Sequence, residues 1–107
     1  MSDGKVFELP GLLSRLDKEG GYFLDFLKVR NLEAGIIVLH PEETDTQGPH
    51  PDDELYFVIK GKGWMQMGKK KVRVEEGSII FIPAGLEHRF YGNDVDLVVL
   101  YVFAAKE

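Results

Sequence analysis

The apolar residues of this chain fall into short runs separated by glycine, proline and acidic residues. Runs of this length that are rich in Val, Ile, Phe and Tyr predict β-strands. In chain order the runs cover residues 22–29, 35–39, 55–59, 64–67, 72–74, 78–82, 88–91 and 97–103. A series of short strands with Gly and Pro between them predicts an all-β sandwich or barrel.

One segment near the N-terminus has a different period. Leu12, Leu13 and Leu16 recur at helical spacing between Pro10 and Gly20. This pattern predicts one or two turns of helix that end at Gly20. The polar stretch at residues 41–51, which holds three prolines and a glycine, predicts a loop.

Two of the predicted strands, residues 55–59 and 79–82, are apolar on both faces. The outer face of an antiparallel barrel is usually polar because it meets water. Something must therefore cover the outside of these strands, either the N-terminal segment or a second subunit. We expect a homodimer.

The overall composition narrows the class of protein. A length of 107 residues predicts a single domain over residues 1–107. The net charge of -5 argues against nucleic acid, whose phosphates would be repelled. The longest apolar run, residues 97–105, is about half of what a membrane helix needs. We therefore expect neither nucleic acid nor a membrane as a partner.

The chain contains no cysteine, so disulfides and thiolate metal sites are excluded. Its first residues lack the basic and apolar regions of a secretory signal. Both observations are compatible with a cytoplasmic protein, which is the location that we expect.

Candidate chemistry lies in two segments that each contain a histidine. Pro83 and Gly85 predict a turn after an apolar strand, and His88 follows at the start of the returning strand. Upstream, His50 and Glu54 are four residues apart just ahead of another apolar strand, which predicts that they share one face. Two histidines and a carboxylate held by strands are a candidate metal site.

The surroundings of Glu54 strengthen this interpretation. In a regular strand Glu54 shares its face with Tyr56 and Val58, which is a mainly apolar wall. A carboxylate on such a wall is costly unless it is paired, protonated or bound to a cation. By the same alternation, Tyr56 is predicted to line the pocket beside Glu54, and Phe90 beside His88.

The residues around His88 resemble the second motif of the cupins, which are small double-stranded β-helices, or jelly rolls. Gly77, Pro83, Gly85 and His88 match this motif, and Asn93 falls one residue after its final asparagine position. The resemblance implies an all-β, double-stranded β-helix or jelly-roll barrel, here with a short N-terminal helical segment.

The first cupin motif is matched in part, by His50, Glu54 and Gly61. The first histidine of that motif falls at Gly48, which has no side chain to offer. A site that resembles three histidines and one glutamate is thus reduced to His50, Glu54 and His88.

Three interpretations of the reduced site follow. In the first, the three side chains form a facial triad with open positions, as suits Fe(II) and related ions. In the second, Gln47 or Asp45 supplies a weaker oxygen ligand. In the third, the site holds no metal and its histidines bind or protonate a substrate directly.

The resemblance implies several activities, among them dioxygenases, decarboxylases, sugar isomerases and epimerases, and non-catalytic binding domains, and the fold does not choose among them. We expect a metal-dependent enzyme of the oxygenase, lyase or isomerase type that acts on a small organic substrate. The expected cofactor is a divalent transition metal such as Fe, Mn, Ni or Zn. The alternatives are a non-catalytic small-molecule-binding protein and a metal-independent sugar epimerase or isomerase.

Overall fold

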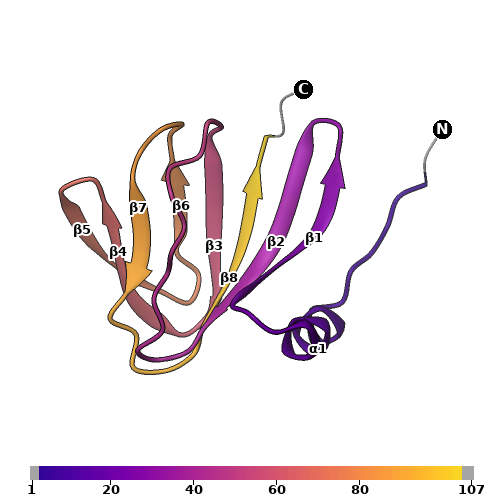
Figure 1. Ribbon diagram of the computed structural model, residues 1–107, viewed down its shortest axis with the longest axis horizontal. Helices are drawn as coiled ribbons and strands as arrows, with labels where there is room; N and C mark the ends of the chain where they lie inside the picture. The colour runs from indigo at the N-terminus through magenta and orange to yellow at the C-terminus, as the bar shows by residue number, and fades with distance from the viewer. Residues whose placement is uncertain (1–2, 105–107) are drawn as a thin grey trace.

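A computed structural model describes residues 3–104 of the chain. Its strands form two antiparallel sheets (Figure 1), a five-stranded sheet of order β1-β2-β8-β3-β6 and a three-stranded sheet of order β5-β4-β7. The elements are α1 (Leu9–Glu19), β1 (Phe23–Val29), β2 (Leu32–Leu39), β3 (Glu54–Lys60), β4 (Lys62–Met67), β5 (Lys70–Glu75), β6 (Ile79–Ile82), β7 (His88–Tyr91) and β8 (Leu97–Phe103). The predicted jelly-roll barrel with a short N-terminal helix is confirmed.

The main core lies between the two sheets because alternate side chains of each strand point inward. On β3, the buried residues Glu54, Tyr56 and Val58 alternate with the exposed residues Leu55 and Phe57. The core cluster consists of Ile37, Leu39, Tyr56, Val58, Met65, Val74, Ile80, Ile82, Phe90, Leu97, Val99 and Tyr101. Glu54 is therefore a carboxylate on the inner face of the barrel, as the alternation predicts.

Helix α1 covers part of the outer face of the five-stranded sheet, beside β1 and β2 (Figure 1). Leu12 and Leu16 pack there against Leu24 and Ile36. The helix has 11 residues, about three turns rather than the predicted one or two. It ends where predicted, at Gly20, whose N–H donates to the Leu16 carbonyl. Within residues 3–104 no helix is long and apolar enough to cross a membrane.

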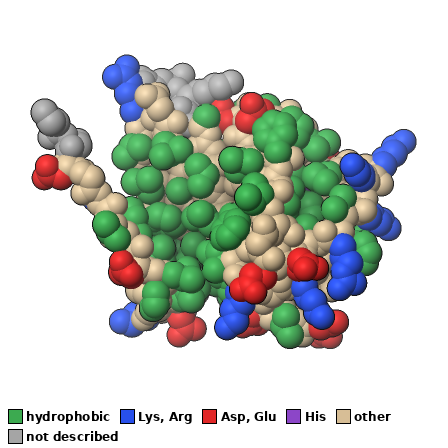
Figure 2. Space-filling view, turned by 180° about the vertical axis from the view of Figure 1, so that it is seen from behind, with side chains coloured by type: hydrophobic (Ala, Val, Ile, Leu, Met, Phe, Trp, Pro, Cys, Tyr) green, Lys and Arg blue, Asp and Glu red, His purple; other side chains and the backbone are tan. Residues whose placement is uncertain are grey.

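The helix leaves the outer face of β3 and β6 open. Leu55, Phe57, Ile79 and Phe81, which we call the outer apolar patch, are between 41% and 71% exposed. Viewed from behind, the molecule presents apolar side chains over a broad area (Figure 2). The N-terminal segment in the described residues is therefore not the cover that these two strands were expected to have.

One close approach on the inner face fixes an aromatic ring near the mouth of the barrel. Gly35 on β2 pairs with Tyr101 on β8. A Cβ atom added at Gly35 would overlap the hydroxyl end of the Tyr101 ring and the Leu24 carbonyl. Glycine is required here because the phenol ring lies directly over the strand.

We predict that Gly35→Ala lowers the free energy of unfolding by about 2 kcal/mol or more, because the added methyl group displaces Tyr101 or the strand. Denaturant unfolding followed by circular dichroism measures the change. Gly11→Ala in α1 is the matched control, since a Cβ there meets no atom within 4 Å. Equal stability of Gly35→Ala and the wild type would contradict the packing described.

Candidate metal centre

The structure brings His50, Glu54 and His88 together. Each offers one ligand atom, and these atoms lie within 4.8 Å of one another. Glu54 Oε1 is 3.4 Å from His88 Nε2 and 3.7 Å from His50 Nε2. A nitrogen–nitrogen–carboxylate set of this kind is a donor arrangement suited to divalent transition metals.

The position of His50 differs from the one predicted. Strand β3 begins at Glu54, so His50 lies on the preceding loop and not on a regular strand. A hydrogen bond from the turn before His88 holds the backbone of His50, since the Gly85 N–H donates to the His50 carbonyl at 2.7 Å. The Ala84 N–H likewise donates to Asp53 Oδ1 at 2.8 Å. The turn after β6 therefore holds the loop that carries His50.

Glu54 is the least satisfied polar group of the site. Its side chain is 1% exposed, and neither carboxylate oxygen has a hydrogen-bond partner among the described residues. A buried carboxylate in this state is costly, and buried charges in proteins are normally paired or bound to a metal. His50 Nε2 is also buried, and no hydrogen-bond partner for it lies in the part of the chain that the structure describes. The residues present thus fit a divalent cation held between them.

His88 is oriented for ligation by its second nitrogen. Its Nδ1–H donates to the Leu86 carbonyl at 2.9 Å, so the neutral ring carries its free lone pair on Nε2, the atom that faces Glu54. Burial alone would lower the pKa of His88. The neighbouring Glu54 carboxylate and the Leu86 carbonyl outweigh burial and raise the pKa above its ordinary value.

The hydroxyl of Tyr56 has two possible acceptors. It lies 2.9 Å from His88 Nε2 and 3.3 Å from Gln47 Oε1. Burial and the charge of Glu54 raise the pKa of Tyr56 strongly, so it remains a neutral phenol. When His88 Nε2 is engaged elsewhere, the hydroxyl can donate to Gln47 and stays satisfied.

Asp45 has a role that the sequence did not reveal. Its Oδ2 accepts the backbone N–H of Phe90 at 2.8 Å, and its Oδ1 accepts hydrogen bonds from Tyr22 and Gln47. These bonds occupy the carboxylate and tie the loop to β7. The prediction that Asp45 turns into the site as a ligand is therefore not supported by the geometry. Its bond to the Gln47 N–H, two residues on, is a turn that aspartate commonly forms.

Position 48, where the family motif has its first histidine, is uncrowded. A Cβ atom added at Gly48 would meet no heavy atom within 4 Å. No described side chain therefore packs where a residue at position 48 would begin. The nearby polar side chain is that of Gln47, whose Nε2 donates to Asp45.

Two cavities of about 300 Å³ each flank the triad. His50 lines the first, His88 lines the second, and Gln47 lines both. Tyr56 and Phe90, which were predicted to line the pocket, are 0% and 1% exposed and line neither cavity. Tyr56 reaches the site only through its hydroxyl.

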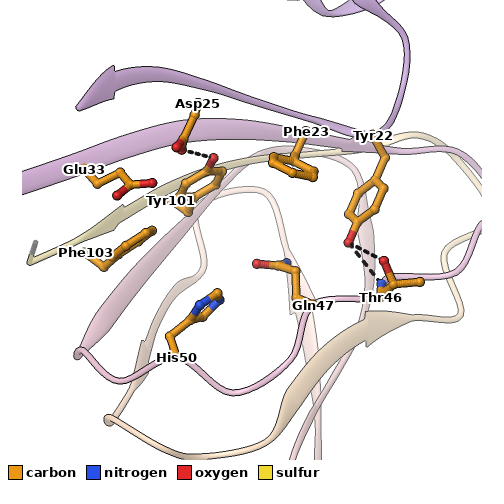
Figure 3. Close-up of a pocket in the computed structure, with 9 residues that line it drawn as sticks. All are labelled: Tyr22, Phe23, Asp25, Glu33, Thr46, Gln47, His50, Tyr101 and Phe103. Atoms are coloured by element: carbon orange, nitrogen blue, oxygen red, sulfur yellow. Dashed lines mark hydrogen bonds between the residues drawn. The ribbon is translucent and has the colours of Figure 1, made fainter.

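Several lining residues of the first cavity were not predicted from the sequence (Figure 3). The ring of Phe103 stacks on that of His50 with centroids 5.5 Å apart. Asp25 and Glu33, from β1 and β2, also line this cavity. Asp25 interrupts an otherwise apolar run, which is the one feature of the sequence that marks it.

Comparisons with known proteins agree with this architecture. The model of the Cupin domain family matches residues 35–103. An uncharacterized protein of Streptomyces coelicolor is 38% identical over 96% of this chain and 98% of its own length. An acireductone dioxygenase of Vitis vinifera is 30% identical over 92% of this chain, which spans 57% of that enzyme's length.

Solved structures resemble the fold at low sequence identity. A Thermus thermophilus protein superposes with a TM-score of 0.78 at 18% identity, covering 95% of this chain and 98% of that one. A cupin family protein with a double-stranded β-helix fold from Methanocaldococcus jannaschii gives 0.70 at 18% identity, covering 77% of each chain. These similarities concern the fold.

We predict that Zn²⁺ binds more weakly as the pH falls below the raised pKa of His88, because a proton on Nε2 must leave before the nitrogen can bind a metal. The loss should approach about tenfold per pH unit for each proton displaced. Competition with a chelating indicator between about pH 8 and pH 5.5 measures it.

His40→Asn is the matched control for this titration. The hydrogen bond to Asp96 raises the pKa of His40 as well, but that residue is exposed and is not part of the triad. The variant should keep the wild-type pH profile. A Zn²⁺ affinity independent of pH would contradict the role given to His88.

Proposed function

This chain belongs to the cupin family, and on that basis we propose that it is a metal-dependent enzyme acting on a small organic molecule that offers oxygen donors. The observation that carries the proposal is Glu54, a carboxylate that is 1% exposed, has no hydrogen bond within residues 3–104 and faces two imidazole nitrogens. A divalent cation offsets the cost of such a group better than any other partner within reach.

In this proposal His50 Nε2, Glu54 and His88 Nε2 hold a divalent Fe, Mn, Ni or Zn ion, and Gln47 is the additional oxygen ligand. The ion supplies Lewis-acid or redox chemistry at the positions that the protein leaves open. Tyr56 stays protonated, and its hydroxyl donates a hydrogen bond to Gln47 Oε1 when His88 Nε2 is engaged. The cavities beside the two histidines are where a substrate enters.

Among reaction types we favour an oxygenase. Several relatives between 25% and 31% identical are acireductone dioxygenases. The chain spans only about half to three-fifths of the length of most of them, so their reaction is a guide to the chemistry and not to the substrate. Lyase and isomerase reactions use the same open positions on a metal.

A second candidate is a protein that binds a small molecule without turnover. Gly48 favours it, because the site then has one side-chain ligand fewer than the family motif provides. A metal-loaded protein that binds a metabolite and returns it unchanged would be the expected behaviour. In either case we propose a cytoplasmic location, which suits a chain without cysteine.

We predict that Glu54→Gln abolishes metal retention, because the amide keeps the shape of the carboxylate but not its charge. Wild-type protein purified without added metal should hold close to one divalent ion per chain by elemental analysis, and the variant less than about a tenth of that. After EDTA treatment the variant should be the more stable protein. Its free energy of unfolding should exceed that of the metal-free wild type by about 1–3 kcal/mol, since a neutral amide is less costly to bury than a carboxylate.

Glu76→Gln is the control for this experiment, since Glu76 is exposed in the turn before β6. It should leave the metal content unchanged. Full metal content in Glu54→Gln would contradict the assignment of the ligands.

We also propose that the protein is a homodimer that buries the outer apolar patch. Leu55 and Phe81 are paired across β3 and β6, as are Phe57 and Ile79, so the four side chains form one continuous surface. Strand β6 is the edge of its sheet, and an apolar edge left open favours association with another chain. Since α1 covers only the other part of this face, a second copy of the chain is the partner that we expect.

We predict that the wild type is a dimer in light scattering at micromolar concentration and that Phe81→Lys is a folded monomer. A charge within the patch opposes burial against a second copy. Val95→Lys, which changes an equally exposed apolar residue outside the patch, should remain dimeric. A monomeric wild type at about 50 μM would refute the proposal.

A further inference from the structure

The first cavity beside the triad has two chemically different sides (Figure 3). His50 and Gln47 lie on one side, and the carboxylates of Asp25 and Glu33 lie across from them. The complete lining consists of Tyr22, Phe23, Asp25, Glu33, Thr46, Gln47, His50, Tyr101 and Phe103. A volume of about 300 Å³ accommodates a small organic molecule that touches both sides.

The acidic side is an organised pair. The hydroxyl of Tyr101, which is 5% exposed, donates a hydrogen bond to Asp25 Oδ1. Glu33 lies near Asp25 on the neighbouring strand, and the proximity of that carboxyl group together with partial burial raises the pKa of Glu33 to about 7. The two carboxyl groups therefore lie close together at one end of the cavity.

A wall of aromatic rings joins the acidic pair to the metal centre. The rings of Tyr101 and Phe103 stack at 6.0 Å and 19°, and those of Phe103 and His50 at 5.5 Å and 14°. Phe23 closes the cavity from β1 (Figure 3). None of the nine lining residues is Lys or Arg. Carboxylates flanked by aromatic faces attract an organic cation, since both the charge and the ring faces favour it.

We propose that this cavity binds a small organic cation of the ammonium type, with its cationic group at Asp25 and Glu33 and its oxygen-bearing end at His50 and the metal. This inference rests on the proposed function and adds the class of substrate. Two separate observations support it: the adjacent carboxyl groups at one end of the cavity and, at the other, His50, whose buried Nε2 has no hydrogen-bond partner among the described residues.

The binding of a cation at Asp25 and Glu33 should depend on pH. An ammonium group competes with the proton that binds Glu33, so the affinity for the cation falls as the pH drops below the pKa of Glu33. The charged groups that act on Glu33 are Asp25 and Lys28 of β1 and Asp52 of the loop, while Tyr101 of β8 acts through Asp25. A neutral ligand of the same shape carries no such dependence.

Two probes of equal shape test the proposal. Calorimetric titration of the Zn²⁺-loaded protein at about pH 8 compares 4-aminobutyrate with pentanoate, which has a methyl group in place of the ammonium. We expect 4-aminobutyrate to bind about tenfold more tightly. The preference should shrink at about pH 6 and disappear in Glu33→Gln and in Asp25→Asn, while Glu76→Gln retains it.

The same titrations separate this inference from the metal proposal. EDTA-treated protein should still prefer n-butylammonium to n-butanol, since the acidic pair needs no metal. If Zn²⁺ fails to bind but this preference is present, the metal proposal fails and the cation site stands. If Zn²⁺ binds and the wild type binds both probes equally, or neither, the cation site is overturned. A preference that survives in both variants overturns it as well.

Discussion

The burial of one carboxylate governs this structure. Glu54 occupies an inward position of β3, where its neighbours on the same face are Tyr56 and Val58. The free energy needed to desolvate the ionised group is recovered if positive charge or a metal lies next to it, and protonation is the alternative. The loop that carries His50 and the turn that precedes His88 place the Nε2 atoms of both rings next to Glu54 Oε1.

The strands were predictable because inward and outward positions alternate along them. The bounds of β7 and β8 match the predicted runs, and the inward direction of Glu54 followed from its phase with Tyr56 and Val58. The convergence of His50, Glu54 and His88 was predicted from the residues and their resemblance to a family pattern. Their role as ligands remains a prediction.

What the sequence did not reveal depends on contacts between distant residues. His50 lies on a loop whose position is set by Gly85, and Asp45 anchors the same loop to Phe90, 45 residues away. Neither hydrogen bond follows from local spacing, since each requires the barrel to be closed first. The acidic pair was missed for a different reason, since Asp25 and Glu33 become neighbours through the register of the local β1–β2 hairpin.

Tyr56 shows how the barrel can accept an ion with little rearrangement. Because its hydroxyl has one acceptor on His88 and another on Gln47, only a hydrogen atom needs to rotate when the imidazole nitrogen is taken. Newly made chains can fold first and be loaded afterwards, and an ion lost under starvation can be regained by a protein that has kept its shape.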